Sequence, residues 1–414
     1  MYNNRLQPVL IELGTASSPA ANSCLVYNYY SGYSFPNPPA CAAPTPTGSN
    51  NGNVLGYFYQ DSSTSSYQHK DVLNYDALNR LTNSTATAVS PGTASYNFSY
   101  SYDRYGNPTC ASSPGTGCPA LGYNAGTNRV SSSGWSYDAA GNLLADGTGT
   151  GTHTYQWDGE GRLSSVDNGS TNNFTYDALG QQVVFKISGN AYDNIFDATG
   201  KVVARYDESV GHFDIPAQFY LGGRRLGYYG GANSTYTKFV HPNALGSTMM
   251  ITDQTTSVVN DTIWYPWGDF WQDVQINGQS FAGSWMRRWE SGLDFSSTRA
   301  YNYGYYRWLS PDPVGGDPTN PQSLNRYAYV LNNPTTLTDP TGLFAPGPCL
   351  DPNSSGCGNP FIDELFSKHC LGSAAALSTP TSATGPMAAR TGPASRASSP
   401  RLRIPPRLGR SRRR

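Results

Sequence analysis

The amino-acid sequence predicts an all-β protein built from repeated β-hairpins. Three observations predict this class. The 414 residues hold 44 Gly, 30 Pro and 30 Tyr but only 13% charged residues, a composition that favours strands and turns over charged helices. An aromatic-Asp pair recurs at intervals of roughly 20 residues, which suits one hairpin with its connections. Short apolar segments follow the pairs, as antiparallel strands would.

Each repeat unit combines an aromatic-Asp pair with a glycine three positions after the aspartate. The Asp side chain can accept hydrogen bonds from turn amides, and Gly supplies a positive φ angle. One unit has Asn79 in place of Gly, and Asn is the residue that next best tolerates the left-handed region. The aromatic residue is expected to pack on the next unit. The Asp and Gly positions are Asp103 and Gly106, Asp138 and Gly141, Asp158 and Gly161, Asp177 and Gly180, and Asp197 and Gly200.

The repeats by themselves predict a wall rather than a binding site. Tyr-rich hairpins need aromatic residues for packing alone, so no single repeat Tyr or Asp is predicted to be a ligand. Flat aromatic faces also suit sugar rings, and Asp accepts hydrogen bonds from hydroxyl groups. Carbohydrate binding by the aromatic surface therefore stays open as an alternative function.

The chain is expected to contain four regions. These are a variable or partial segment over 1–50, repeats over 51–238, a core segment over 239–343 and a variable tail over 344–414. The tail carries 10 basic and 3 acidic residues, a net charge of +7, while residues 1–343 carry 17 basic and 25 acidic residues, a net charge of −8. The tail has no period that could bury a face and is predicted to be disordered. Its Arg-rich end has no packed module beside it, so no nucleic-acid partner is expected.

The cysteines and histidines predict no metal site. Of seven Cys, two pairs flank short loops, Cys110 with Cys118 and Cys349 with Cys357, and could close disulfides in an oxidising compartment. The five His are scattered without the spacing of a zinc site. No phosphate-binding loop, catalytic-serine elbow or His-Glu-x-x-His motif occurs, so no cofactor is predicted. The sequence also shows no signal peptide and no transmembrane segment.

The repeat units resemble the YD (Rhs) repeats of bacterial Rhs proteins, Tc-toxin C components and animal teneurins. Units such as YDAAGNLLADG and WDGEGRLSSVDNG carry the likeness, which covers roughly residues 50–343. The resemblance implies a β-hairpin spiral that forms part of a hollow shell, often around a C-terminal toxin. Residues 239–343 resemble the Rhs repeat-associated core domain. Matching markers include Leu245-Gly246-Ser247, Pro266-Trp267-Gly268, Arg307 and Asn332-Asn333-Pro334, whereas Asn243, Ala300 and Tyr306 depart from the pattern.

In many members, the resemblance implies self-cleavage by two Asp-Pro-x-Gly motifs. Here the motifs begin at Asp312 and Asp339, and the cut would fall between Leu343 and Phe344. Two adjacent carboxyls cannot both ionise cheaply, so one would stay protonated while the other activates water. Arg307 could pair with the ionised partner, or it could cap a turn. The interval between the motifs is longer than is typical, and the same sequences also form ordinary turns.

The sequence therefore predicts a C-terminal fragment of a bacterial Rhs polymorphic-toxin shell. It would be secreted or displayed at the cell surface as part of a longer chain. Its expected partners are its own C-terminal segment as cargo and secretion-system or toxin-complex components. Release of the cargo would follow aspartyl self-cleavage after Leu343. The alternative is a non-catalytic cell-surface YD-repeat protein that binds carbohydrate.

Overall fold

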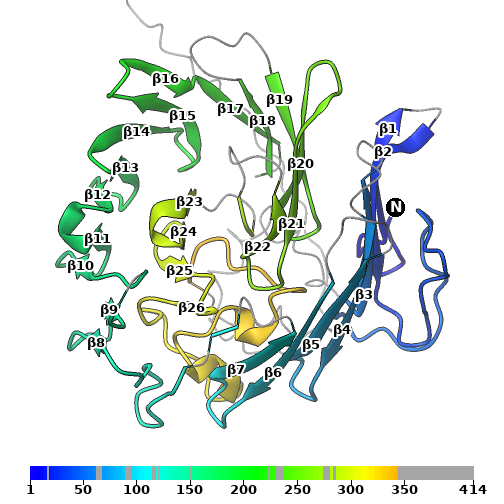
Figure 1. Cartoon of the computed structure of the whole chain (residues 1–414), viewed down its shortest axis with the longest axis horizontal. Helices are drawn as coiled ribbons and strands as arrows, with labels where there is room; N and C mark the ends of the chain where they lie inside the picture. Colours follow the sequence, from blue (N-terminus) through cyan, green and yellow to red (C-terminus); the bar gives the residue numbers. More distant parts are fainter. Residues whose placement is uncertain are drawn as a thin grey trace, which may run out of the picture. The chain divides into compact units, whose positions relative to one another are not determined.

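A computed structural model describes most of the chain up to Leu343 (Figure 1). The described residues all lie in one compact unit, Met1–His369. The predicted disorder of the tail, the Cys349–Cys357 pair and Phe344 lie outside the described residues. The described ranges are 1–15, 18–61, 68–88, 95–113, 118–119, 121–149, 151–221, 224–229, 237–273, 280–282 and 286–343.

The described chain forms antiparallel strands that pair in chain order, as Figure 1 shows. The first sheet has seven strands: β1 (Leu10–Thr15), β2 (Ser18–Asn28), β3 (Gly56–Asp61), β4 (Gln68–Tyr75), β5 (Leu81–Ala88), β6 (Tyr96–Tyr102) and β7 (Pro108–Ser113). A two-stranded sheet, β8 (Trp135–Tyr137) and β9 (Leu143–Asp146), follows. The next seven-stranded sheet comprises β10 (Tyr155–Trp157), β11 (Leu163–Val166), β12 (Asn172–Tyr176), β13 (Gln182–Ile187), β14 (Asn190–Phe196), β15 (Val202–Asp207) and β16 (His212–Ile215).

Two further sheets belong mainly to the core segment. One has six strands, β17 (Ala217–Leu221), β18 (Arg224–Tyr229), β19 (Thr237–Pro242), β20 (Thr248–Asp253), β21 (Val258–Trp264) and β22 (Phe270–Asp273). The other has four, β23 (Met286–Arg288), β24 (Leu293–Phe295), β25 (Ala300–Asn302) and β26 (Arg307–Trp308). Short 3₁₀ helices are η1 (Asp167–Gly169), η2 (Trp289–Ser291), η3 (Pro321–Leu324) and η4 (Val330–Asn332).

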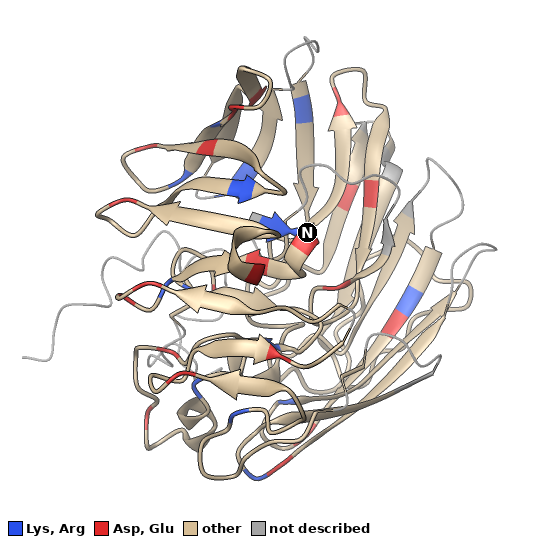
Figure 2. Ribbon diagram, turned by 60° about the vertical axis from the view of Figure 1, so that its left-hand side comes forward, with Lys and Arg blue, Asp and Glu red and all other residues tan. Residues whose placement is uncertain are grey.

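The repeat turns are closed by their aspartates, as the sequence predicts. In one example, Asp76 Oδ1 accepts hydrogen bonds from the amides of Leu78 and Arg80, each at 2.9 Å. Asn79 has a φ of 61°, in the left-handed region where the other units place Gly. The turn aspartates lie at the ends of hairpins (Figure 2). Turn chemistry therefore sets the register of each hairpin.

The aromatic residues of several pairs contact the preceding unit, whereas the sequence analysis expects the next one. Tyr102 Oη donates to the Leu81 carbonyl at 2.6 Å, and Tyr176 Oη donates to the Leu163 carbonyl at 2.8 Å. The reason is antiparallel pairing, because the end of one strand lies beside the start of the strand before it. Equivalent bonds join Tyr75 to Val54, Trp157 to Leu143 and Tyr220 to Val202.

The core segment packs against repeats from both halves of the described chain. One hydrophobic cluster joins first-sheet residues such as Tyr59 to Trp267 and Tyr301 of the core segment. A second cluster joins Tyr155 and Phe185 of the repeats to four residues of the core segment, Leu293, Phe295, Ala300 and Leu309. Because these aromatic rings are almost fully buried, they supply much of the apolar area removed from water on folding.

Among the residues that the structure describes, two disulfides tie loops to the first sheet. The Cys110–Cys118 bond, which the sequence suggests, is present. A second bond joins Cys24 to Cys41 across 17 residues, a pairing that no local loop motif indicates. β1 and β2, which lie in the segment that the sequence leaves open, pair into the same sheet as the repeats.

Candidate active site

The turn before β25 and the segment after β26 bring three charged side chains together. Arg299 precedes β25, and Asp312 follows β26. Arg299 Nη2 lies 2.8 Å from Asp312 Oδ2 and 3.4 Å from Asp339 Oδ2. The three residues are 5%, 5% and 2% exposed. The two aspartates that the sequence singles out therefore share one buried guanidinium.

Backbone hydrogen bonds fix the position of Asp312. Its amide donates to the Arg326 carbonyl at 2.8 Å, and its own carbonyl accepts from Arg326 Nε. Its Oδ1 accepts from the Val314 amide at 2.9 Å, which closes the first Asp-Pro-x-Gly turn. Oδ2 is thereby directed toward Arg299.

Asp339 closes the second Asp-Pro-x-Gly turn. Its Oδ1 accepts from the amides of Gly342 and Leu343, at 2.9 and 3.1 Å. Its Oδ2 lies toward Arg299 and so toward Asp312. One carboxyl group thus contacts both the predicted cleavage segment and the neighbouring charges.

Burial dominates the electrostatics of this site. Loss of solvation raises the pKa of Asp339 from 3.8 to about 6. Arg299 and the amides of Gly342 and Leu343 lower this pKa, but by less than burial raises it, and the neighbouring Asp312 raises it further. Burial likewise lowers the pKa of Arg299 to about 10, against the attraction of both aspartates. Its guanidinium carbon also lies 4.2 Å from the centroid of the Trp308 ring. Burial therefore makes Asp339 easier to protonate than an ordinary aspartate.

Comparison with known proteins identifies the fold that carries this site. Residues 54–221 match the family described as Teneurin YD-shell. This region carries YD-shell repeats. It is 27% identical to the tRNA3(Ser)-specific nuclease WapA of Bacillus spizizenii over 258 residues, which are 59% of this chain and 11% of that protein. It is 31% identical to the toxin subunit YenC1 of Yersinia entomophaga over 115 residues, 27% of this chain and 11% of that protein.

Solved structures share the YD-shell fold. The crystal structure of TcdB2-TccC3 without the hypervariable C-terminal region has a TM-score of 0.61 and 18% sequence identity, covering 83% of this chain and 18% of that one. The predicted all-β fold class and the resemblance to YD-repeat proteins are confirmed. The chain spans 11% of the length of the WapA and YenC1 relatives that it matches.

The long interval between the two aspartates is tied to the YD-shell repeats. Asn332 Nδ2 donates to the Gly106 carbonyl at 2.8 Å, and Tyr327 Oη donates to the Gly141 carbonyl at 2.8 Å. These carbonyls belong to repeat turns. Other bonds of this kind join Asn325 to Asn107, Asn333 to Asn53 and the Val54 amide to Thr336. Residues 325–336 of the interval are therefore anchored to the repeats, and the interval does not separate Asp312 from Asp339.

Arg307 lies elsewhere, and the cation between the aspartates is Arg299. Arg307 Nη2 donates to the Asn128 carbonyl at 2.5 Å, and its guanidinium carbon lies 5.0 and 4.9 Å from the centroids of the Tyr123 and Tyr327 rings. Within the described residues, Arg307 forms no ion pair with either aspartate. The structure thus assigns the carboxylate contact to Arg299, which the sequence analysis does not propose as a site residue.

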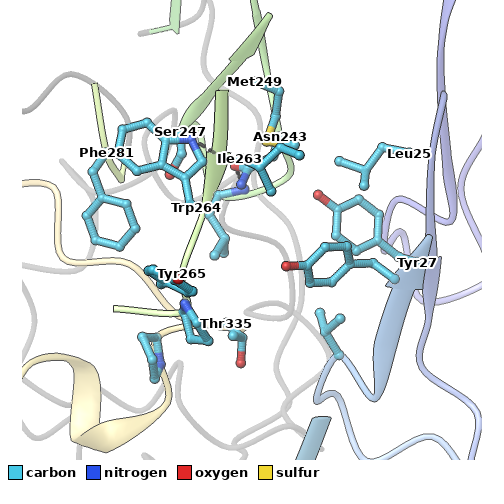
Figure 3. A pocket seen from close by; sticks show the side chains of 15 residues that line it. Leu25, Tyr27, Asn243, Ser247, Met249, Ile263, Trp264, Tyr265, Phe281 and Thr335 are labelled. Atoms are coloured by element: carbon cyan, nitrogen blue, oxygen red, sulfur yellow. Dashed lines mark hydrogen bonds between the residues drawn. The ribbon is translucent and has the colours of Figure 1, made fainter. Parts of the chain in front are cut away.

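Another concave region is an apolar pocket between β2 and β21. Figure 3 shows Leu25 and Tyr27 on one side and Met249, Ile263 and Trp264 on the other. Its polar lining groups already have partners; for example, Ser247 Oγ accepts from the Ala282 amide at 2.9 Å. Among the described residues no cluster of His, Cys, Asp and Glu could hold a metal ion. No helix among them is long and apolar enough to cross a membrane.

Proposed function

We propose that this chain is part of a toxin shell and cuts its own backbone after Leu343, releasing the following segment. The observation that carries the proposal is the buried pair of carboxylates held by Arg299 beside residues 342 and 343. Toxin relatives such as YenC1 support the toxin-shell role. Its partners would be the released segment as cargo and components of a toxin complex.

The proposed reaction is hydrolysis by an acid and a base. Asp312, which accepts from Arg299, takes a proton from water as the oxygen adds to the Leu343 carbonyl carbon. Asp339, whose pKa is raised to about 6, supplies a proton to the leaving nitrogen of Phe344. The C–N bond breaks, leaving a carboxyl on Leu343 and an amine on Phe344. One water is consumed, and no cofactor is required.

Carbohydrate binding gains no support from the described surface. The paired aromatic residues of the repeats are half-buried, and Tyr102, Trp157 and Tyr176 each donate a hydrogen bond to the preceding hairpin. A sugar ring needs an accessible aromatic face. We therefore propose self-cleavage and not carbohydrate binding.

Intact mass spectrometry of the full chain with a tag at each end tests the proposal. We expect two fragments that divide after Leu343 in the parent and one uncut species in Asp312→Asn and in Asp339→Asn. General acid-base groups typically contribute about 100-fold to 10,000-fold to a rate. Asp177→Asn is the matched control, because Asp177 closes a repeat turn in the same way. An uncut parent, or an Asp339→Asn chain that cuts at the parent rate, would overturn it.

A further inference from the structure

The turn between β24 and β25 holds the two carbonyls that precede the proposed cut. Ser297 Oγ and Thr298 Oγ1 donate to the Thr341 carbonyl at 3.0 and 2.7 Å. Arg299 Nε donates to the next carbonyl, that of Gly342. We infer that the turn residues Ser296, Ser297, Thr298 and Arg299 form a substrate cradle, which positions the chain for cleavage and accepts only glycine at position 342. The inference rests on the proposed function and names its specificity-determining residues.

The cradle and Asp339 bind the backbone of residues 341–343 from opposite edges. The carbonyls of residues 341 and 342 point to the turn, while the amides of Gly342 and Leu343 donate to Asp339 Oδ1. The Leu343 carbonyl is the next polar group along the backbone. With the preceding groups fixed on both sides, that carbonyl has little freedom relative to the carboxylates. Such pre-orientation is a main source of rate in intramolecular reactions.

The space around Gly342 explains why only glycine fits. A Cβ on Gly342 would lie 2.2 Å from Ser296 Oγ and 2.9 Å from Thr298 Oγ1. Ser296 cannot move aside freely, because its Oγ donates to the Arg299 carbonyl and accepts from the Arg299 amide, both at 3.0 Å. Gly342 also has a φ of 75°, which disfavours any residue with a side chain.

The exposure of Ser297 and Thr298 allows a role in cleavage to be tested apart from a role in folding. Ser297 and Thr298 are exposed residues, unlike Ser296 and Arg299. Replacing an exposed hydroxyl with hydrogen changes the stability of a fold little. If these hydroxyls served only the fold, their removal would leave cleavage unchanged. If they position the substrate, their removal slows cleavage in a chain that folds normally.

The first test is Ser297→Ala/Thr298→Ala in the doubly tagged full chain. We expect cleavage to slow by about tenfold to a hundredfold, the effect of one or two neutral hydrogen bonds. The slowing should be the same at every pH, because the aspartates keep their surroundings. Thr199→Ala is the control, since its hydroxyl donates to a turn Asp far along the sequence from the cut. A double variant that cuts at the parent rate would overturn the cradle.

The second test is Gly342→Ala beside Gly200→Ala. Both glycines sit at the same turn position with similar φ angles, 75° and 83°, so the backbone strain of the two changes is matched. Only Gly342 is crowded by fixed atoms, because Gly200 faces the flexible end of Gln181 at 3.2 Å. We expect cleavage to fall more than a hundredfold in Gly342→Ala and to be unchanged in Gly200→Ala. Equal rates in the two variants would contradict glycine selection by the cradle.

Hydrogen exchange separates a failure of the cradle from a failure of the proposed function. If the parent does not cut, the exchange rates of the Gly342 and Leu343 amides still report on the cradle. We expect the Ser297→Ala/Thr298→Ala variant to exchange these amides at least several-fold faster, since the turn that orients them is loosened. Unchanged exchange would rule the cradle out regardless of cleavage.

Discussion

The repeat turn at residues 197–201 and the core turn at residues 339–343 are nearly the same structure in different surroundings. The first reads DATGK and the second DPTGL. In both, the Asp Oδ1 accepts from the amide four residues on, and the Gly has a positive φ. The Lys201 amide is the main cause that lowers the pKa of Asp197, whereas burial raises the pKa of Asp339. Burial and a second carboxyl therefore distinguish a candidate catalytic turn from a structural one.

The largest expected difference between the two turns is in the pH dependence of cleavage. With a pKa of about 6, Asp339 gains its proton as the pH falls from 8 to 6, and its protonated fraction rises about 50-fold. We expect the cleavage rate constant to rise by a similar factor. Asp197→Asn should leave this profile unchanged, because the pKa of Asp197 is lowered. A flat profile between pH 6 and 8 would remove Asp339 as the acid.

The free energy of unfolding should also depend on pH through Asp339, with a smaller effect than the one on cleavage. The folded chain holds a proton on Asp339 below about pH 6, whereas an ordinary Asp does so only below about 3.8. The free energy of unfolding therefore falls as pH rises through this window, by up to about 3 kcal/mol for this carboxyl.

Urea unfolding at pH 4 and pH 7 measures this contribution in the slow-cutting Ser297→Ala/Thr298→Ala chain. Adding Asp339→Asn should reduce the loss of stability between the two pH values. A pH dependence that stays the same after this substitution would show that Asp339 titrates normally in the folded chain.

The repeats could be predicted from the sequence because each repeat turn is formed by residues that lie close together in the chain. Asp, Gly and the aromatic residue lie within six positions of one another, so turn chemistry alone identifies them. The pairing of Asp312 with Asp339 follows from the family resemblance. Arg299 and Cys24–Cys41 could not be predicted, because their contacts depend on tertiary packing. Arg307 has the right charge, but its position in β26 directs it to the repeats instead.

Removing the carboxyl of a repeat turn should affect stability without affecting cleavage. Asp158 Oδ1 accepts from the amides of Glu160 and Arg162 at 3.0 and 2.9 Å, and its Oδ2 accepts from Arg162 Nε at 2.7 Å. We expect Asp158→Ala to lower the free energy of unfolding by about 1 to 3 kcal/mol, since these donors lose a charged acceptor. Chemical denaturation and the two-tag cleavage assay measure the two effects. A loss of cleavage in this variant would show that the two turns are not independent.

The smallest expected effect concerns the bond between one hairpin and the next. Tyr102→Phe removes the hydroxyl that donates to Leu81, while the ring remains beneath Arg80, whose guanidinium carbon lies 4.5 Å from the ring centroid. Because the Leu81 carbonyl loses its partner in a buried place, we expect the free energy of unfolding to fall by about 1 kcal/mol. Tyr229→Phe, at a 39% exposed ring, should change it little. Equal effects of the two changes would mean that stacking of the rings, and not the tyrosine hydroxyl, joins successive hairpins of the wall.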